Sequence, residues 1–230
     1  MQRGILLTFS GILCVFLITS GCAKKEEAPQ KGVAAQKEAL QVAEKKEVPK
    51  PSGKPITEER VLFSFENDTN GFEIPFWALE KDDHVARSIT VSEKYVSEGE
   101  KSLKVESDFP GQKWTAALIE LEQYLDLSPY REIAVDIYLP KKAPMGLRAK
   151  LVLTIGESWK FTEMTRSVPL VPGEWTKVYG NIEPGSYDWK RIVPDESFRR
   201  DVRKIAVRVE SNKRPVYKGP IYIDNIRIGK

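Results

Sequence analysis

The sequence of 230 residues contains only two cysteines and one histidine. With so few thiols and imidazoles, a zinc site built from Cys and His side chains is excluded, and any mechanism that requires a histidine must use His84. The sequence also has no Gly-rich phosphate-binding loop and no G-x-S-x-G nucleophile motif. A single histidine near the start of an expected strand is more typical of a surface or hydrogen-bonded side chain than of a catalytic one.

A block of charge of one sign is also missing. The 36 Lys and Arg residues nearly balance the 33 Asp and Glu residues, and the formal net charge is +3. Nucleic-acid binding needs a concentrated basic patch that follows the phosphates, so we expect no nucleic-acid partner. The content of 41% hydrophobic and 30% charged residues is typical of a soluble globular domain.

Residues 1–21 are predicted to be an export signal. Arg3 precedes an apolar run that extends from Ile5 to about Ile18, and small residues follow. A run of about 14 apolar residues is too short to span a bilayer as a helix but suits the core of a signal peptide.

The segment Ile-Thr-Ser-Gly-Cys at 18–22 resembles the lipobox of bacterial lipoproteins, although Thr19 stands where that family most often has Leu. The resemblance implies cleavage before Cys22 and lipidation of Cys22, and thus a membrane anchor in the cell envelope. Ala23 at the next position favours the outer membrane where the bacterium has two membranes. The alternative is an ordinary secretory signal that contains a cysteine by chance. Because Cys14 would be removed with the signal, the mature domain would have no disulfide.

Residues 22–60 are predicted to be the lipidated cysteine and a flexible linker. The segment is rich in Lys, Glu, Ala, Gln and Pro and has no aromatic residue. It cannot bury enough apolar area to offset the entropy of ordering. A short coiled-coil contact is the alternative, but Val33, Leu40 and Val48 are too sparse for sustained heptads.

The remainder, residues 61–230, is predicted to be one all-β domain. Short runs of alternating or β-branched residues recur between turn residues. We expect strands at 61–65, 72–79, 85–91, 102–107, 115–121, 132–139, 147–155, 158–163, 175–179, 204–210 and 221–228. In 147–155 the apolar side chains alternate with Arg148, Lys150, Val152 and Thr154, as in an antiparallel sheet with one covered face. These features predict a two-sheet antiparallel sandwich, with a long connection over 186–201 that contains a helical turn near 196–201.

Three motifs carry a family resemblance. Phe-Ser-Phe-Glu occurs at 63–66, Glu-Gly-Glu-Lys-Ser-Leu-Lys-Val at 98–105 and Tyr-Ile-Asp-Asn-Ile at 222–226. Their order resembles the galactose-binding-like β-sandwich, and in particular the carbohydrate-binding modules with jelly-roll topology. Phe72 stands where that family usually has Trp. The resemblance covers nearly all of 61–230 and implies a jelly-roll fold.

The same resemblance implies a structural Ca²⁺. The side chains of Glu66 and Asp224 would supply oxygen ligands, and main-chain carbonyls near Glu98 and Lys101 would complete the site. Calcium binds six to eight oxygens and accepts carbonyls from a turn. The alternative is that Glu66 and Asp224 are solvated residues at strand ends.

For a sugar ligand we expect aromatic side chains beside polar groups on one sheet face. The candidates are Trp77, Trp114 and Trp159, accompanied by Tyr138, Asp136, Arg148, Arg208 and Glu210. Core or loop packing is the alternative for each tryptophan. The predicted function is non-catalytic binding of a glycan or polysaccharide. The second hypothesis is an envelope protein–protein adaptor or structural lipoprotein, and the third is a polysaccharide lyase or hydrolase.

Overall fold

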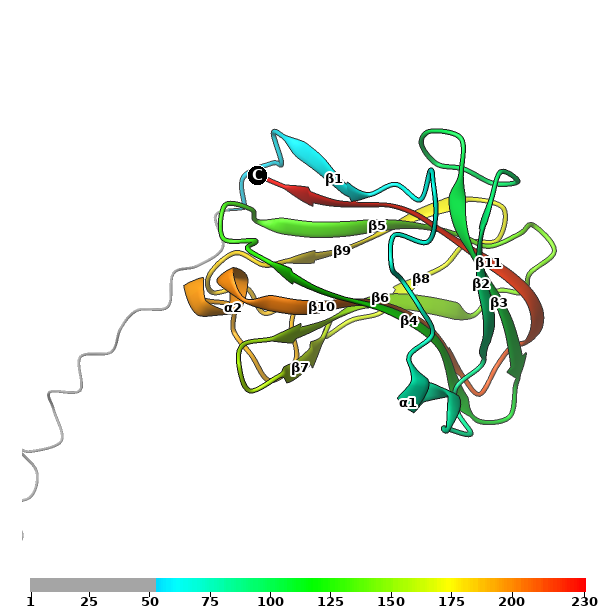
Figure 1. Cartoon of the computed structure of the whole chain (residues 1–230). Coiled ribbons are helices and arrows are strands. Elements are labelled where there is room, and N and C mark those ends of the chain that lie inside the picture. Colours follow the sequence, from blue (N-terminus) through cyan, green and yellow to red (C-terminus); the bar gives the residue numbers. More distant parts are fainter. Residues whose placement is uncertain (1–52) are drawn as a thin grey trace, which may run out of the picture. The chain divides into compact units, whose positions relative to one another are not determined.

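The computed structural model describes residues 53–230, in which two antiparallel β-sheets lie face to face (Figure 1). The expected signal peptide, Cys22 and most of the expected linker lie outside the described residues. The all-β sandwich predicted from the alternating strands is confirmed. We name the two layers sheet A and sheet B.

Sheet A has the order β2-β3-β11-β5-β9, and β1 pairs with the remaining part of one edge of β11. Its strands are β1 Glu59–Phe63, β2 Ala86–Ser92, β3 Ser102–Pro110, β5 Glu132–Tyr138, β9 Trp175–Asn181 and β11 Val216–Gly229. Sheet B has the order β4-β10-β6-β7, and β8 pairs with β6. Its strands are β4 Trp114–Leu125, β6 Leu147–Ile155, β7 Lys160–Glu163, β8 Val168–Pro169 and β10 Val202–Asn212.

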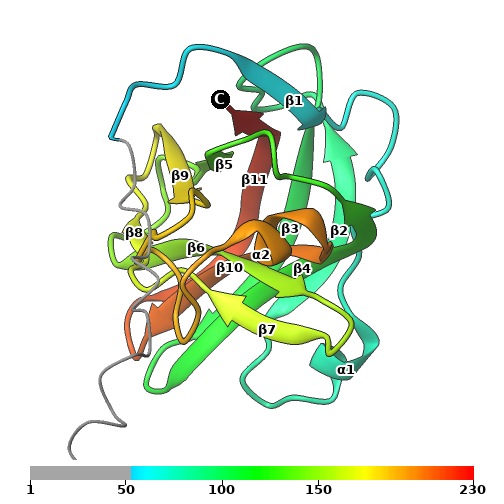
Figure 2. The same cartoon turned by 90° about the vertical axis from the view of Figure 1, so that its left-hand side faces the viewer.

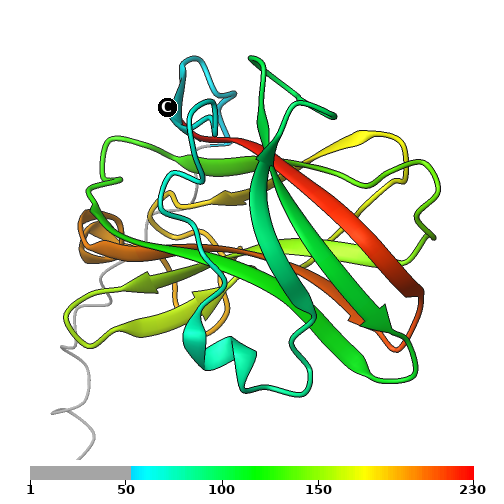
Figure 3. The ribbon, with the colours of Figure 1, turned by 45° about the vertical axis from the view of Figure 1, so that its right-hand side comes forward.

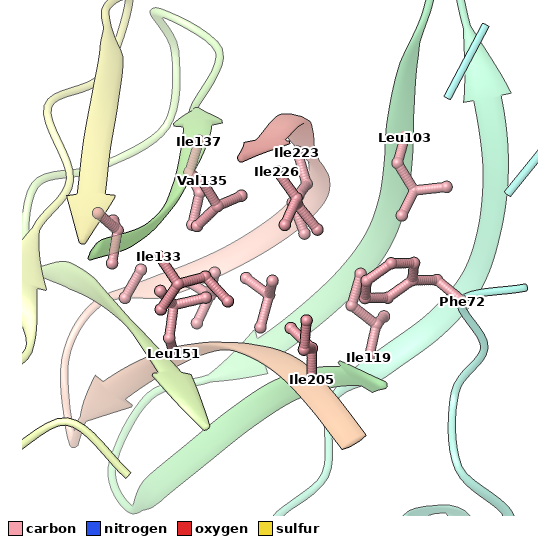
Figure 4. Packing of buried hydrophobic residues seen from close by; sticks show 14 of the residues in the cluster. Phe72, Leu103, Ile119, Ile133, Val135, Ile137, Leu151, Ile205, Ile223 and Ile226 are labelled. Atoms are coloured by element: carbon pink, nitrogen blue, oxygen red, sulfur yellow. The ribbon is translucent and has the colours of Figure 1, made fainter. Parts of the chain in front are cut away.

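Alternation along each strand separates the core from the two outer faces. In β6, Leu147, Leu151 and Leu153 are fully buried between the sheets. Figure 4 shows side chains of both layers meeting there, including Ile133, Ile137 and Ile223 of sheet A and Leu151 and Ile205 of sheet B. Since successive strand residues point to opposite faces, Lys150 and Val152 of β6 face outward.

A short helix, α2 (Glu196–Arg200), covers one end of the sandwich (Figure 2). Asp195 caps it, because its carboxylate accepts a 2.8 Å hydrogen bond from the Phe198 backbone N–H. Phe198 is buried against Trp189, with ring centroids 5.9 Å apart. The helical turn expected near 196–201 is therefore confirmed. Neither helix within residues 53–230 has the length and apolar character needed to span a membrane.

Two expectations about the start of the domain were wrong. Residues 72–79 do not form a strand but contain the one-turn helix α1 (Phe76–Leu79), which begins after Pro75. The first strand, expected at 61–65, starts two residues earlier, since β1 is Glu59–Phe63. Just upstream, the Arg131 guanidinium donates to the carbonyls of Lys54 and Pro55 and thus fastens this part of the expected linker to the sandwich.

Candidate functional site

The chain between β1 and β2 forms a wall beside sheet B. It pairs with β4 at two points: Glu73 exchanges two backbone hydrogen bonds of 3.0 and 2.9 Å with Glu120, and Asp83 and Val85 bond to Ala116. The two points lie four residues apart on β4, so the longer stretch between Glu73 and Asp83 must loop outward. The loop contains α1 and runs beside β4 in Figure 3.

The outer face of sheet B has an apolar centre. Leu118 of β4, Ala206 of β10 and Val152 of β6 form a small buried cluster separate from the main core. Their side chains share this face because Glu120 pairs with Ala206 and Ala206 pairs with Val152 in the strand register. An apolar patch on the outer side of a sheet needs a cover, which the surrounding aromatic residues partly provide.

Four large aromatic side chains stand around this centre and remain partly open to solvent. Their exposed fractions are 48% for Trp77, 39% for Trp114, 40% for Trp159 and 52% for Phe161. They come from α1, β4, the β6–β7 turn and β7. We call the surface that they enclose the aromatic groove.

The aromatic groove consists of two hollows that share Trp77, Leu118 and Phe161. The larger, of about 420 Å³, extends to Trp114, Arg208 and His84. The smaller, of about 220 Å³, extends to Trp159, Lys204 and Glu120. A ring bound in either hollow would thus contact aromatic faces and charged side chains together, as in sites for small polar ligands.

His84 is buried with a ring nitrogen left unpaired by the described residues, whereas the sequence favoured a surface or hydrogen-bonded side chain. It is 7% exposed, and its Nε2 has no hydrogen-bond partner among residues 53–230. Burial, helped by the charge of Arg87, lowers the pKa of His84 below its ordinary value, although Asp83 acts in the opposite direction. The imidazole is therefore neutral at pH 7.

A network of ion pairs extends from Arg208 along the same outer face of sheet B. Arg208 contacts both Glu163 and Glu210, and Lys150 lies 3.5 Å from each of the same two carboxylates. Burial by itself would raise the pKa of Glu163, but the hydrogen bond from Lys190 and the charges of Arg208 and Lys150 outweigh it and lower that pKa. Glu163 is thus an ionised hydrogen-bond acceptor at pH 7, and it lacks the raised pKa that suits a general acid.

Most of the candidate sugar-contacting residues do share this face. Trp77, Trp114, Trp159 and Arg208 line the aromatic groove, and Glu210 joins Arg208 through an ion pair. Arg148 lies on the same face but farther along β6, where its guanidinium bonds to Ser167. The structure therefore brings these six residues to one side of the sandwich.

Tyr138 and Asp136 do not belong to this set, and their assignment to the same face was wrong. Both lie on β5 of sheet A and point to its outer side, away from the aromatic groove. Tyr138 is 9% exposed and stacks on Tyr95, with ring centroids 4.4 Å apart. Asp136 accepts a 2.8 Å hydrogen bond from Arg227.

Sequence reasoning missed Phe161, Glu163 and the pair of Glu120 and Lys204. In β7 the alternation is inverted, since Thr162 is buried and Phe161 is half exposed. The signal that identifies Phe161 is the hairpin register: with Ile155 opposite Lys160, Phe161 pairs with Thr154, which faces outward.

A second polar site lies at the border of sheet A. One edge of β11 pairs with β3 up to Ile223 and with β1 from Ile226 onward. Asp224 and Asn225 lie between these two paired stretches of β11. Glu66, which follows β1, and residues 97–100, which precede β3, approach them there. A hollow of about 380 Å³ here is lined by Glu66, Glu98, Gly99, Asp224 and Asn225, among others.

Asp224 is fully buried and accepts hydrogen bonds from the backbone N–H groups of Ser97, Glu98 and Asn225. Burial raises the pKa of Asp224, although these hydrogen bonds oppose the shift. The Oδ1 atom of Asn225 is buried and lacks a hydrogen-bond partner within residues 53–230. A buried carboxylate beside an unpaired amide oxygen is a donor set that fits a hard cation.

Glu66 completes the border from the other side, where its carboxylate accepts hydrogen bonds from the Glu100 backbone N–H. A Cβ added to Gly99 would lie 2.0 Å from Glu66 Oε1, so this close approach requires glycine. Within residues 53–230 no three His, Cys, Asp or Glu side chains are arranged to hold a metal, so main-chain and amide oxygens would have to contribute. Lys101 does not line the hollow.

Comparison with known proteins gives structural matches only, since no family model and no curated protein matches the sequence. CBM27-1 of Caldicellulosiruptor saccharolyticus, a carbohydrate-binding module solved with mannohexaose, is similar with a TM-score of 0.52 and 21% identity, over 75% of this chain and 97% of that one. CBM28, a module specific for non-crystalline cellulose, has a TM-score of 0.55 and 20% identity, over 76% and 96%. The chain therefore has the β-sandwich fold of these carbohydrate-binding modules.

Proposed function

We propose that this protein binds a glycan without catalysis in the aromatic groove of sheet B. The observation that carries the proposal is the set of four half-exposed aromatic rings around an apolar floor, with Arg208 and Lys204 at their margins. Pyranose rings present apolar C–H faces and a rim of hydroxyls, so they suit aromatic platforms with adjacent hydrogen-bonding groups. The similarity in fold to carbohydrate-binding modules supports the same conclusion.

The alternative of a hydrolase finds less support in this groove. A glycosidase needs one carboxylic acid with a raised pKa beside a carboxylate. The Glu163–Glu210 pair is bridged instead by Lys150 and Arg208, and the pKa of Glu163 is lowered. The pair suits a rigid, ionised hydrogen-bonding surface.

Affinity electrophoresis tests the proposal. The purified protein would migrate through gels that contain soluble mannan, xylan, β-glucan or modified cellulose. We expect retention in at least one gel, and Trp114→Ala and Trp159→Ala should each weaken the affinity about 10- to 100-fold, as for central aromatic contacts in other interfaces. Tyr179→Ala is the matched control, because Tyr179 is 50% exposed on the outer face of sheet A. Equal retention of all variants would contradict the assignment.

We also propose that Cys22 carries a lipid that anchors the domain in the cell envelope, with the outer membrane favoured by Ala23 where the bacterium has two membranes. The lipobox-like segment at 18–22 supports this proposal. Labelled fatty acid should enter the wild-type protein and not Cys22→Ser, and the variant should leave the membrane fraction. Unchanged labelling of the variant would overturn the assignment.

Finally, we propose a structural Ca²⁺ at the border of sheet A. Asp224 and Asn225 of β11 and Glu66 would hold it, together with main-chain oxygens near Glu98. The cation would offset the cost of ionising the buried Asp224 and would join β11 to the two segments that meet beside it.

A further inference from the structure

One acid–base pair connects two tryptophans of the aromatic groove. The indole N–H of Trp77 donates to Glu120 Oε1 at 3.4 Å, and Lys204 Nζ donates to the same oxygen at 3.0 Å. The Lys204 Nζ atom also lies 5.8 Å from the ring centroid of Trp159, within the range of a cation–π contact. Glu120 and Lys204 thus lie between the two aromatic walls of the smaller hollow.

Trp77 has few other supports. It lies on the one-turn helix α1, in which Phe76 and Leu79 are 77% and 57% exposed and only Ala78 is buried. A helix of this length has little intrinsic stability. The backbone is fixed to β4 only on either side of α1, at Glu73 and Asp83. The hydrogen bond to Glu120 is thus the polar contact that can fix the orientation of the indole.

Glu120 is well placed for this role. It lies in the middle of β4, its backbone holds Glu73 of the same wall, and it is only 9% exposed. Lys204 holds its carboxylate from β10 and also pairs with Glu122 at 3.2 Å. A carboxylate held from its own sheet is a firm acceptor for the indole N–H.

We propose that Glu120 is a positioning residue that holds Trp77 in the orientation needed for glycan binding. This inference rests on the proposed function of the aromatic groove. Glu120 acts through the indole N–H, so its removal weakens binding only as far as Trp77 loses its orientation. A residue that contacted the glycan by itself, or that only stabilised the fold, would not depend on Trp77 in this way.

A double-mutant cycle separates these roles. The variants are Glu120→Met, which keeps the length and removes the acceptor, Trp77→Phe, which removes the donor, and the combination. Calorimetry with the polysaccharide that the wild type retains should show a loss of about tenfold for each single variant and no further loss for the double variant. Additive losses would overturn the proposal. Glu120→Gln keeps an acceptor oxygen and should restore most of the affinity.

Glu122→Met is the matched control, because Glu122 pairs with Lys204 but is not part of the groove lining. It should bind as the wild type does, and a tenfold loss would assign the effect to Lys204 instead of Glu120.

A measurement without ligand keeps the inference separate from the proposed function. In a nitrogen–proton NMR spectrum, the Trp77 indole signal is identified by its absence in Trp77→Phe. Glu120→Met should shift this signal upfield and speed its exchange with solvent, whereas Glu122→Met should not. An unchanged signal refutes the positioning role even if the wild type binds glycan. A changed signal in a protein that binds none of the glycans refutes the proposed function alone.

Discussion

The two outer faces of the sandwich both carry a cluster of aromatic side chains, but the cluster on sheet A is packed and the cluster on sheet B is open. On sheet A, Tyr95 stacks on Tyr138, and Tyr222 and Trp175 pack around them, so that Tyr138 and Tyr222 are 9% and 1% exposed. On sheet B the aromatic side chains of the groove are 39% to 52% exposed.

The difference arises from the connecting loops. The β2–β3 connection lies on sheet A and inserts Tyr95 among the other rings, while its following residues reach Asp224. The β1–β2 connection runs beside the edge strand β4 (Figure 3) and pairs with it. It places Trp77 at the margin of a hollow on the face of sheet B, which stays open. An aromatic cluster on a sheet face is thus covered or left open to solvent according to where the neighbouring loop ends.

The largest expected effect is a difference in the free energy of unfolding between a substitution on sheet A and one on sheet B. Tyr222→Ala should lower the free energy of unfolding by about 3–5 kcal/mol, because it removes a buried ring that touches Tyr95 and Tyr138. Phe161→Ala should lower it by less than about 1 kcal/mol, since that ring is half exposed. Urea denaturation measures both. Folded Tyr222→Ala should bind glycan as the wild type does, and Phe161→Ala should bind it about tenfold more weakly. The reverse result would exchange the roles of the two faces.

The second prediction concerns the loop that closes sheet A. The folded-state pKa of Asp224 is raised above 3.8, so without a cation its contribution to stability is present at low pH and is lost as pH rises through the raised pKa. Calcium at 100 times its dissociation constant should restore about 2.7 kcal/mol at pH 7.

Thermal melts with and without a chelator provide the measurement. The chelator should lower the melting temperature at pH 7 and have little effect below the ordinary pKa of Asp224, where the carboxyl is protonated in both states. Asp224→Asn is the control and should abolish the chelator effect. No chelator effect at pH 7, together with no metal by elemental analysis, would reject the calcium site.

The smallest expected effect belongs to the open face. The folded-state pKa of Glu163 is lowered from 4.5, so its contribution to stability is present above that value and is lost as pH falls through the lowered pKa. Glu163→Gln should therefore lower the free energy of unfolding by about 1–2 kcal/mol at pH 7, because it removes a half-buried charge while Glu210 remains as a partner for Arg208 and Lys150. The difference from the wild type should vanish at acid pH in urea denaturation. A constant difference at every pH would assign the effect to packing.

Part of this architecture could be predicted from local patterns. The alternation of Leu147, Leu151 and Leu153 with Arg148 and Lys150 identifies which side of β6 is buried, because side chains repeat every two residues in a strand. The run at 72–79 gave the wrong prediction, since a short apolar segment can be a strand, a helical turn or a loop with equal local plausibility. Its conformation is set by the two distant contacts with β4.

The sequence by itself determined the all-β class, the inward and outward sides of β6, and the polar character of the residues around 66 and 224. It could not determine that Tyr138 and Arg208 lie on opposite outer faces, because alternation distinguishes inside from outside and does not say to which of two sheets a strand belongs. That choice depends on pairing between strands far apart in the chain, such as β5 with β11 and β10 with β4. Tertiary structure alone also decided which aromatic cluster is covered, since a loop covers a face only after the strands beneath it have paired.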